Sequence, residues 1–260
     1  MKIKNTRGIK QYYKIQAEKF GTDGRSTISD MNTRNIEIDA ILKYIKDDKK
    51  VLEIGCGNGY TAKMLVQKKK INLTSIDFSE DLINLAKKQV IGDAIGKAVF
   101  DIGDATKLNF SEGSFDIIFT ERCLINLITW ENQKKALLEI HRVLKKGGVF
   151  IMLEAFTDGW KNLNETREEF YLKTISQSPH NLFFDKKKVM SFSKNKFEFL
   201  EENNFLSTYH FGSRVLYPLL LKLTTGKEPK YDSRFNAFFA DMSPHGNYSS
   251  TKIMVFKKIK

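Results

Sequence analysis

The sequence is poor in cysteine and proline, and it has no long apolar stretch. Among its 260 residues are only two cysteines, Cys56 and Cys123, and four prolines. Two cysteines are too few for a disulfide framework or a four-cysteine zinc site, so no metal site is predicted. No apolar run approaches the roughly 20 residues that span a bilayer. The basic start MKIKNTRGIKQYYK lacks the apolar segment of a secretory signal, so a cytoplasmic protein without a membrane span is expected.

Acidic residues are in the minority. The chain has 43 Lys and Arg against 31 Asp and Glu, a net charge of +12. Such a surplus permits binding to nucleic acid, anionic membranes or phosphorylated molecules. The lysines lie in short separate groups such as Lys68–Lys70 and Lys186–Lys188, which favours a generally solvated basic surface.

Residues 50–156 alternate between short apolar runs and segments of helical periodicity. Strands are predicted at residues 51–55, 73–78, 97–103, 115–121 and 147–156. Helices are predicted at residues 61–69, 79–90 and 130–146. This alternation is typical of a mainly parallel sheet covered on both faces. The predicted fold class is therefore α/β, a doubly wound and mainly parallel sheet, with seven strands once two late strands are added.

The rest of the chain is predicted to decorate this core within a single domain, 1–260. The proposed parts are a helical N-terminal cap at 1–48, a cofactor-binding core at 49–156, lid insertions at 157–192 and 212–250, and last elements at 193–211 and 251–260. Residues 157–192 read as irregular. A helix is predicted at 192–205, and strands at 205–212 and 251–259, from their apolar spacing.

A glycine loop follows the first predicted strand, in the stretch VLEIGCGNGY. Its glycines are Gly55, Gly57 and Gly59. A dinucleotide fingerprint needs G-x-G-x-x-G, whose last glycine would fall at Tyr60. A Walker loop is excluded because no Gly-Lys-Ser/Thr ends the turn. The loop therefore points to a ligand approached closely by backbone, but not to a pyrophosphate.

Acidic residues end the next two predicted strands. Asp77 can accept hydrogen bonds from the two hydroxyls of a ribose, or it can instead cap the helix at Ser79. Asp104 can accept from an adenine amine, with the Ala105 N–H facing the ring and Phe78 covering its face. Together with the glycine loop, these residues predict an adenosine-containing ligand.

This constellation resembles the class I S-adenosylmethionine-dependent methyltransferases over roughly residues 35–155. The shared motifs are G-x-G-x-G after strand one, an acid ending strand two, Gly-Asp-Ala after strand three, Phe115-Asp116-Ile117-Ile118, and LLEIHRVLKKGGVFIML. The resemblance implies a Rossmann-like methyltransferase fold with S-adenosyl-L-methionine as cofactor. It also implies that Glu53, Asn58 and the loop glycines lie beside the methionine part, with Asp77 at the ribose and Asp104 and Ala105 at the adenine.

Further residues are assigned on the same resemblance. The backbone of Thr120–Arg122, including Glu121, is expected near the methionine amine. Arg34 or Tyr12 is expected to close over the cofactor carboxylate. Tyr13, Phe183 and Phe184 are further candidates for the pocket wall, with core packing as the alternative for each.

Methyl transfer is an in-line displacement, so the protein mainly aligns the acceptor and excludes water. An oxygen acceptor also needs a general base. His180 is the first candidate and His245 the second, because both follow Ser-Pro in loops expected over the site. Arg122 is the candidate for pairing with an acidic acceptor.

The predicted acceptor is a small molecule, methylated on O or N, that is sugar-like or phosphoryl-bearing. The layout resembles methyltransferases of bacterial surface-polysaccharide or small-metabolite pathways, and Arg122, Arg214 and Arg234 would suit an anion. The segment Thr120–Cys123 lacks the Asn/Asp-Pro-Pro-aromatic motif of base methyltransferases, so nucleic acid is not the expected partner. An RNA methyltransferase and a non-catalytic S-adenosylmethionine-binding regulator remain the alternatives. The oligomeric state is left open.

Overall fold

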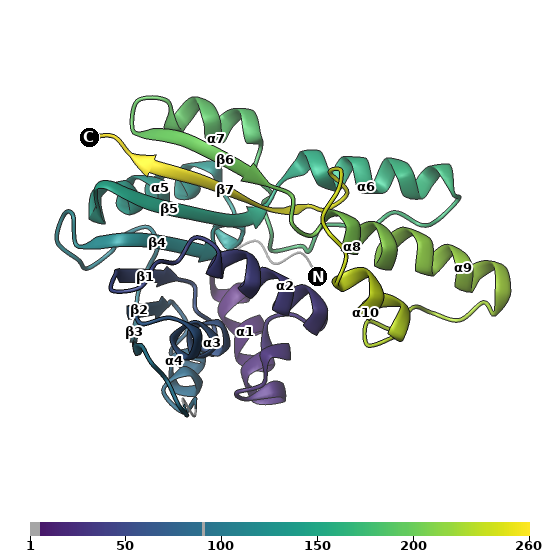
Figure 1. Cartoon of the computed structure of the whole chain (residues 1–260), viewed down its shortest axis with the longest axis horizontal. Helices are drawn as coiled ribbons and strands as arrows, with labels where there is room; N and C mark the ends of the chain where they lie inside the picture. The colour runs from purple at the N-terminus through teal and green to yellow at the C-terminus, as the bar shows by residue number, and fades with distance from the viewer. Residues whose placement is uncertain (1–5, 90–91) are drawn as a thin grey trace.

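A single twisted sheet runs through the protein (Figure 1). The computed structural model describes residues 6–89 and 92–260. The strands are β1 (Lys50–Ile54), β2 (Asn72–Asp77), β3 (Lys97–Ile102), β4 (Phe115–Glu121), β5 (Leu144–Ala155), β6 (Phe197–Asn203) and β7 (Thr251–Lys258). Their order is β3-β2-β1-β4-β5-β7-β6, parallel from β3 to β5, with β7 antiparallel to both β5 and β6. The order reverses between β1 and β4, and ligands of open α/β sheets bind at such a point.

Helices cover both faces of the sheet. The helical segments before β6 are α1 (Thr6–Phe20), η1 (Gly24–Ser26), α2 (Met31–Leu42), α3 (Tyr60–Lys68), α4 (Glu80–Ala86), η2 (Leu124–Asn126), α5 (Trp130–Val143), α6 (Thr157–Glu169) and α7 (Lys186–Ser193). Those after it are α8 (Ser207–Phe211), η3 (Gly212–Leu216), α9 (Tyr217–Thr224) and α10 (Arg234–Ala240). The predicted α/β fold with a doubly wound, mainly parallel seven-stranded sheet is confirmed.

Side chains that alternate along the strands pack into two separate hydrophobic cores, one on each face of the sheet. Val51 packs with α2, α3 and α8 on one face, whereas its neighbour Leu52 packs with α5 and α7 on the other. Successive side chains of a strand point to opposite faces, so a strand that is apolar at both positions must be covered twice. Burying each such aliphatic side chain contributes about 1.5–3 kcal/mol.

Two late elements were predicted with the wrong type. Residues 192–205 were expected as a helix, but Phe197–Asn203 is strand β6, which pairs with β7 and sets Phe199 opposite Phe256. The alternation of Phe and Glu in 197–199 has the period of a strand. Residues 205–212 were expected as a strand, but Ser207–Phe211 is helix α8, which places His210 on a helix. There Phe205, Leu206 and Tyr209 pack into one core at helical spacing.

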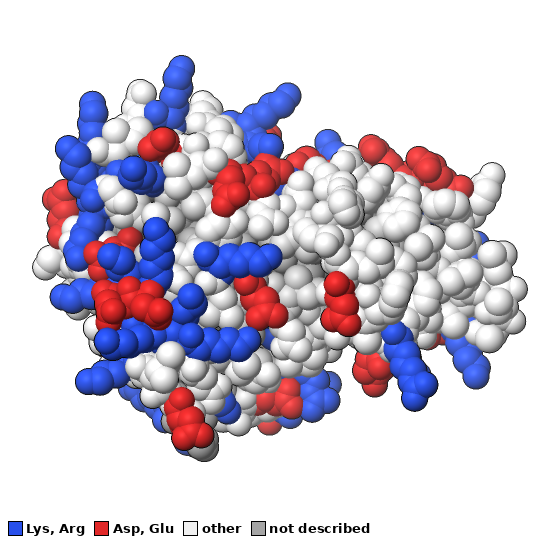
Figure 2. Space-filling model, viewed as in Figure 1, with Lys and Arg blue, Asp and Glu red and all other residues white. Residues whose placement is uncertain are grey.

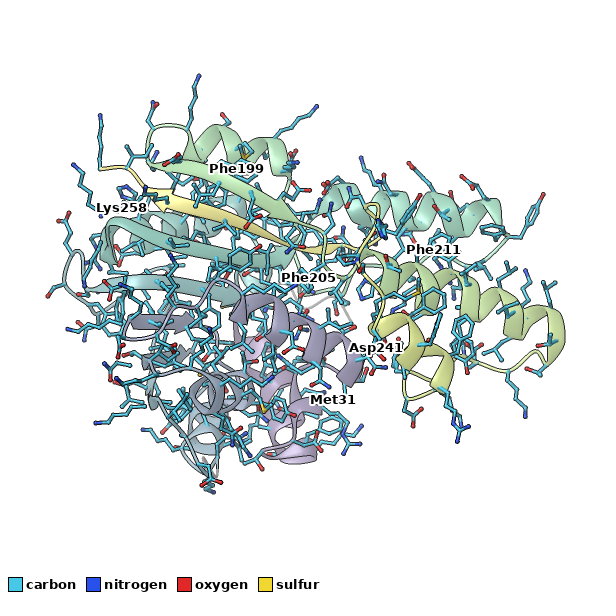
Figure 3. The ribbon with its side chains drawn as sticks, in the orientation of Figure 1. Met31, Phe199, Phe205, Phe211, Asp241 and Lys258 are labelled. Carbon is cyan, nitrogen blue, oxygen red and sulfur yellow. The ribbon has the colours of Figure 1, made fainter. Side chains whose placement is uncertain are left out.

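The late segments form a helical lobe beyond the carboxyl edge of the sheet, at the right of Figure 1. It contains α6, η3, α9 and α10, so residues 157–192 are not irregular as predicted but include α6 and α7. Helix α10 packs beside α2, near the labels of Met31 and Asp241 in Figure 3. Arg214 in the π-helical turn η3 joins the lobe to α2 through an ion pair of 2.6 Å with Asp30, the buried N-cap of α2.

Candidate active site

The glycine loop after β1 is shaped by close approaches that only glycine tolerates. Gly55 has φ +85°, and a Cβ there would lie 2.3 Å from Cys123 Sγ. Gly59 has φ +77°, and its Cβ would lie 2.9 Å from the Cβ of Ala86 in α4. These positive φ values strain any residue with a side chain. The loop is thereby drawn against the end of β4 and against α4, leaving its backbone at the edge of a cavity.

That cavity has a volume of about 200 Å³ and lies between the glycine loop, the ends of β2 and β4, and helices α1 and α2. The wall includes the following residues predicted from the sequence: Arg34, Gly55, Gly57, Asp77, Phe78, Asp104, Ala105, Glu121 and Arg122. Segments far apart in the chain therefore meet at the carboxyl ends of the strands, as the resemblance implied.

Asp77 is buried at the end of β2, with its carboxylate on the cavity wall. The carboxylate accepts hydrogen bonds from the N–H groups of Gly57 and Ser79, each 2.9 Å long. Burial raises the pKa of Asp77 to about 6, although these backbone hydrogen bonds oppose the rise. Ser79 itself caps α4 by accepting from Leu82 N–H. Asp77 thus braces the loop and the start of α4 while it faces the cavity.

The adenine-side residues lie at the other end of the same wall. One oxygen of the exposed Asp104 accepts from the Thr106 N–H at 2.8 Å and from its hydroxyl at 2.7 Å. Ala105 is buried, and Phe78 lines the cavity from the end of β2. This arrangement offers a carboxylate, a backbone segment and an aromatic ring to one planar group.

A cluster of buried charges closes the opposite end. Arg34 Nη1 lies 2.5 Å from Glu121 Oε1, and the Thr61 hydroxyl donates to the other Glu121 oxygen at 2.7 Å. Arg122 Nε lies 3.0 Å from the fully buried Glu37. Two arginines thus face two glutamates beside the cavity.

The two carboxyl groups of this cluster titrate in opposite directions. Burial raises the pKa of Glu37 to about 8, although Arg122 opposes it. Burial also acts on Glu121, but Arg34 and Arg122 outweigh it and lower the pKa of Glu121.

Glu37 was not predicted from the sequence as a site residue. Its signal is an acid on the buried face of α2, three residues after Arg34 and beside Ile38 and Ile41.

Three polar atoms of residues on the wall are buried without a hydrogen-bond partner in the described part of the chain: Asn126 Oδ1, Arg34 Nε, and Arg122 Nε, which is ion-paired with Glu37. Buried polar atoms without partners are uncommon and typical of sites that await a ligand. An amide oxygen can receive an ammonium group and a guanidinium can receive a carboxylate, the two ends of an amino acid. The wall therefore fits the methionine part of the expected cofactor as well as its adenosine.

Four residues predicted to contact the cofactor do not line the cavity: Glu53, Asn58, Gly59 and Tyr12. Glu53 is buried beneath the loop and accepts from the Ser75 hydroxyl at 2.6 Å, and burial raises its pKa to about 8. Asn58 donates to the carbonyls of Gly21 and Asp23, which ties the loop to the turn after α1. Gly59 starts α3 against α4. The positions of Glu53, Asn58 and Gly59 support the shape of the loop rather than the wall.

The two predicted bases are in different surroundings. His180 is 6 % exposed, and its ring centroid lies 4.8 Å from that of Tyr12 and 6.3 Å from that of Tyr13. Burial lowers the pKa of His180, which keeps the imidazole neutral. It lies behind Tyr13, which lines the cavity, and Tyr12 does not line it. His245 is exposed and bonded through its backbone to Ser207 and Thr208 in α8, so the structure does not bring it to the cavity.

The fold and this wall define a Rossmann-like α/β protein with a site for an adenosine-containing cofactor. Residues 51–148 match the family described as methyltransferase domain. The motifs, the fold and this match identify residues 51–148 as a class I S-adenosylmethionine-dependent methyltransferase domain. The cofactor of this class is S-adenosylmethionine, as predicted.

Curated relatives match only part of the chain. A demethylmenaquinone methyltransferase of Leptospira interrogans is 37% identical over 107 residues, which cover 40% of this chain and 42% of the relative. A ubiquinone/menaquinone biosynthesis C-methyltransferase of Campylobacter jejuni is 29% identical over 171 residues, covering 63% of this chain and 69% of the relative. The chain thus spans about two fifths of the length of the first relatives it matches.

Solved structures share the whole fold at low sequence identity. The Pyrococcus horikoshii PH0226 protein matches with a TM-score of 0.60 at 19% identity, over 95% of this chain and 98% of its own. A chain of the Haloferax volcanii complex between the Trm112 methyltransferase activator and a putative methyltransferase matches with 0.63 at 17%, over 94% and 96%. At this identity the likeness concerns the fold alone. Within residues 6–89 and 92–260, no helix has the length and apolar character to cross a membrane.

Proposed function

We propose that the protein transfers a methyl group from S-adenosylmethionine to a small, largely apolar acceptor of the quinol type. The observation that carries the proposal is the cavity itself, where Asp77, the glycine loop and the Arg34–Glu121 pair meet on one wall. The names of the curated relatives, which are quinone-pathway methyltransferases, support the acceptor class.

The chain's own residues would hold the cofactor along this wall. Asp77 accepts from the ribose hydroxyls, and Asp104 and Ala105 take the adenine edge. Asn126 Oδ1 receives the ammonium group, and Arg34 receives the carboxylate. The bound cofactor supplies an electrophilic methyl group on a sulfonium, already attached to a good leaving group. The protein's part is therefore alignment and exclusion of water.

The acceptor side is more apolar than a sugar or phosphate would need. Ile9, Leu127 and Ile128 line the cavity there. Of the arginines considered for an anionic acceptor, Arg122 is paired with Glu37 and Arg214 with Asp30. Both guanidinium groups are held by carboxyl groups of the protein itself, so they give little support to a phosphoryl-bearing acceptor. Arg234 lies on α10, outside the cavity wall.

A quinol needs to lose a phenolic proton before carbon or oxygen attacks the methyl group. His180 remains the candidate for this proton, because burial keeps its imidazole neutral and able to accept. The His180 ring contacts the rings of Tyr12 and Tyr13 and does not itself line the cavity. Contact between His180 and an acceptor therefore requires Tyr13 or Tyr12 to shift.

The surface charge does not favour the RNA alternative. On the face drawn in Figure 2, lysine and arginine side chains are interspersed with acidic ones, and the lobe is mostly uncharged. Backbone recognition of RNA would be better served by one continuous basic tract.

The test has two parts. Calorimetry with S-adenosylhomocysteine should show binding to the wild type and at least 100-fold weaker binding to Asp77→Ala. Asp101→Ala, which changes an exposed acid of β3, is the control.

Radiolabelled S-adenosylmethionine should then label a 2-prenyl-1,4-naphthoquinol. Equal binding by Asp77→Ala would refute the cofactor site, and cofactor binding without quinol labelling would refute the acceptor class. Loss of labelling in His180→Ala with normal binding is expected if His180 is the base.

A further inference from the structure

Tyr13 carries a phenol from the N-terminal helix into the cavity. Helix α1 packs against α4 and η1, and both Tyr13 and Ile9 line the cavity. Residues four apart lie on the same face of a helix. This face of α1 therefore forms one side of the site, although α1 belongs neither to the sheet nor to the glycine loop.

The ring of Tyr13 is held by aromatic neighbours on several sides. It meets Phe78 edge-on, with ring centroids 6.2 Å apart and an angle of 87°. It meets Tyr12 at 5.3 Å and His180 at 6.3 Å, again nearly perpendicular. Edge-to-face pairs of this kind fix the orientation of a ring. Since Phe78 follows Asp77 directly, the phenol is brought to the ribose end of the wall.

The hydroxyl of Tyr13 stands among polar groups but is bonded to none of them. No described residue makes a hydrogen bond with it, and Asp77 and Arg122 act on it electrostatically. Burial raises the pKa of Tyr13, and Asp77 raises it further, so the phenol stays protonated and remains a donor. A phenylalanine would satisfy packing alone, whereas the half-buried Tyr13 adds a hydroxyl that can donate a hydrogen bond at the cavity wall.

The size of the cavity shows what this ring does to the site. Its volume of about 200 Å³ is below the roughly 300–1,000 Å³ of most ligand pockets. With Tyr13 in this position there is little room for a cofactor and an acceptor together. Tyr13 therefore covers part of the site.

We propose that Tyr13 is a cofactor-contacting residue that closes the site, its hydroxyl donating to the bound cofactor between Asp77 and Arg122 and its ring covering it. This inference rests on the proposed function, because it assumes that the cavity holds S-adenosylmethionine. Release of S-adenosylhomocysteine then requires α1 to move away from Phe78.

The experiment measures S-adenosylhomocysteine affinity by calorimetry and its release by stopped-flow displacement. Tyr13→Phe keeps the ring, so its affinity should fall about fivefold, the effect of one neutral hydrogen bond. Tyr13→Ala removes ring and hydroxyl, and its affinity should fall at least 20-fold, mostly through faster release. Lys14→Ala, on the exposed side of the same helix, should stay within twofold of the wild type.

Hydrogen exchange provides a readout that a merely structural role would not change. In the wild type, S-adenosylhomocysteine should slow amide exchange in α1, and this protection should be lost in Tyr13→Ala while the ligand-free spectra and melting curves match. The inference is overturned if Tyr13→Ala binds and releases like the wild type, if Tyr13→Phe is indistinguishable from it, or if the ligand leaves α1 exchange unchanged. A wild type that binds no S-adenosylhomocysteine refutes the proposed function instead.

Discussion

Arg34 on α2 and Glu121 at the end of β4 form an ion pair of 2.5 Å, with side chains that are only 5% and 4% exposed. The pair joins the N-terminal helices to the sheet at the wall of the cavity. Thr61 donates to the same carboxylate from α3, so three elements converge on Glu121.

Removing one member of this pair should be costly. Arg34→Met leaves Glu121 as a buried carboxylate without its main partner, and the expected loss is about 3–5 kcal/mol in the free energy of unfolding. The double variant Arg34→Met with Glu121→Gln should recover part of that loss, because no unpaired charge remains. Urea unfolding measures both. Equal stability of Arg34→Met and wild type would show that the pair contributes nothing to the fold.

The approach of Gly55 to Cys123 gives a second prediction. Gly55→Ala adds a Cβ 2.3 Å from Cys123 Sγ at a φ of +85°, so a loss of about 3–5 kcal/mol is expected from contact and backbone strain together. Gly147→Ala is the matched control, since its φ is +75° and nothing lies within 4 Å of its Cβ; about 1–2 kcal/mol is expected there.

The contact term can be isolated by a double-mutant cycle. Cys123→Gly removes the opposing side chain, so Gly55→Ala should cost less in that background and approach the value for Gly147→Ala. Thermal or urea unfolding of the four proteins measures the coupling. If Gly55→Ala is no worse than Gly147→Ala, the close approach has no energetic consequence.

The central sheet and the part of the cavity wall around the glycine loop could be predicted, because the sequence patterns that indicate them are local. Strand-length apolar runs, the spacing of Gly55, Gly57 and Gly59, and the acids at Asp77 and Asp104 all lie within short segments. The late elements could not, because the local alternation in β6 is confined to residues 197–199 and the strand is otherwise held by its pairing with β7. The apolar run at 205–212 has no partner strand, and its burial against α2 and α3 makes it a helix instead.

The same limit applies to the site residues. Glu37 lies on a helix far in sequence from the motifs and meets the site only through Arg122, so no spacing rule points to it, whereas Tyr13 was predicted as a candidate for the pocket wall and lines it. His180 and His245 share the local sequence Ser-Pro-His, yet His180 is buried beside Tyr12 and His245 is exposed in a loop whose backbone is hydrogen-bonded to α8. Local sequence cannot separate them, because only tertiary packing does.

Glu53 predicts an unusual dependence of stability on pH. Its folded pKa of about 8 lies above the ordinary 4.5, so the native state holds a proton that the unfolded state releases. The resulting stabilisation is complete below about pH 4.5 and lost as the pH rises through 8. The free energy of unfolding should therefore fall between about pH 4.5 and 8, by at most about 1.4 kcal/mol per pH unit from this residue, and level off above pH 8.

Glu53→Gln tests this assignment, because the amide keeps an acceptor for the Ser75 hydroxyl but cannot ionise. Urea unfolding from pH 6 to 9 should give it a shallower decline than the wild type. Glu112→Gln, an exposed change, should leave the wild-type slope unaltered. Parallel declines in wild type and Glu53→Gln would assign the pH dependence to other buried acids, such as Glu37 and Glu154, whose pKa values are also raised.

Asp77 predicts that cofactor binding weakens in acid. Its pKa of about 6 in the ligand-free protein means that the carboxyl is increasingly protonated below pH 6. Ribose hydroxyls need an acceptor, and the ionised carboxylate supplies the stronger one. The affinity for S-adenosylhomocysteine should be constant above about pH 7 and fall by up to tenfold per unit below pH 6, measured by calorimetry between pH 5 and 8.

The Asp77→Asn variant should bind S-adenosylhomocysteine more weakly and lose this pH dependence, whereas the Asp104→Asn variant should bind more weakly but keep it. An affinity of the wild type that does not change from pH 5 to 8 would show that ionisation of Asp77 plays no part in binding.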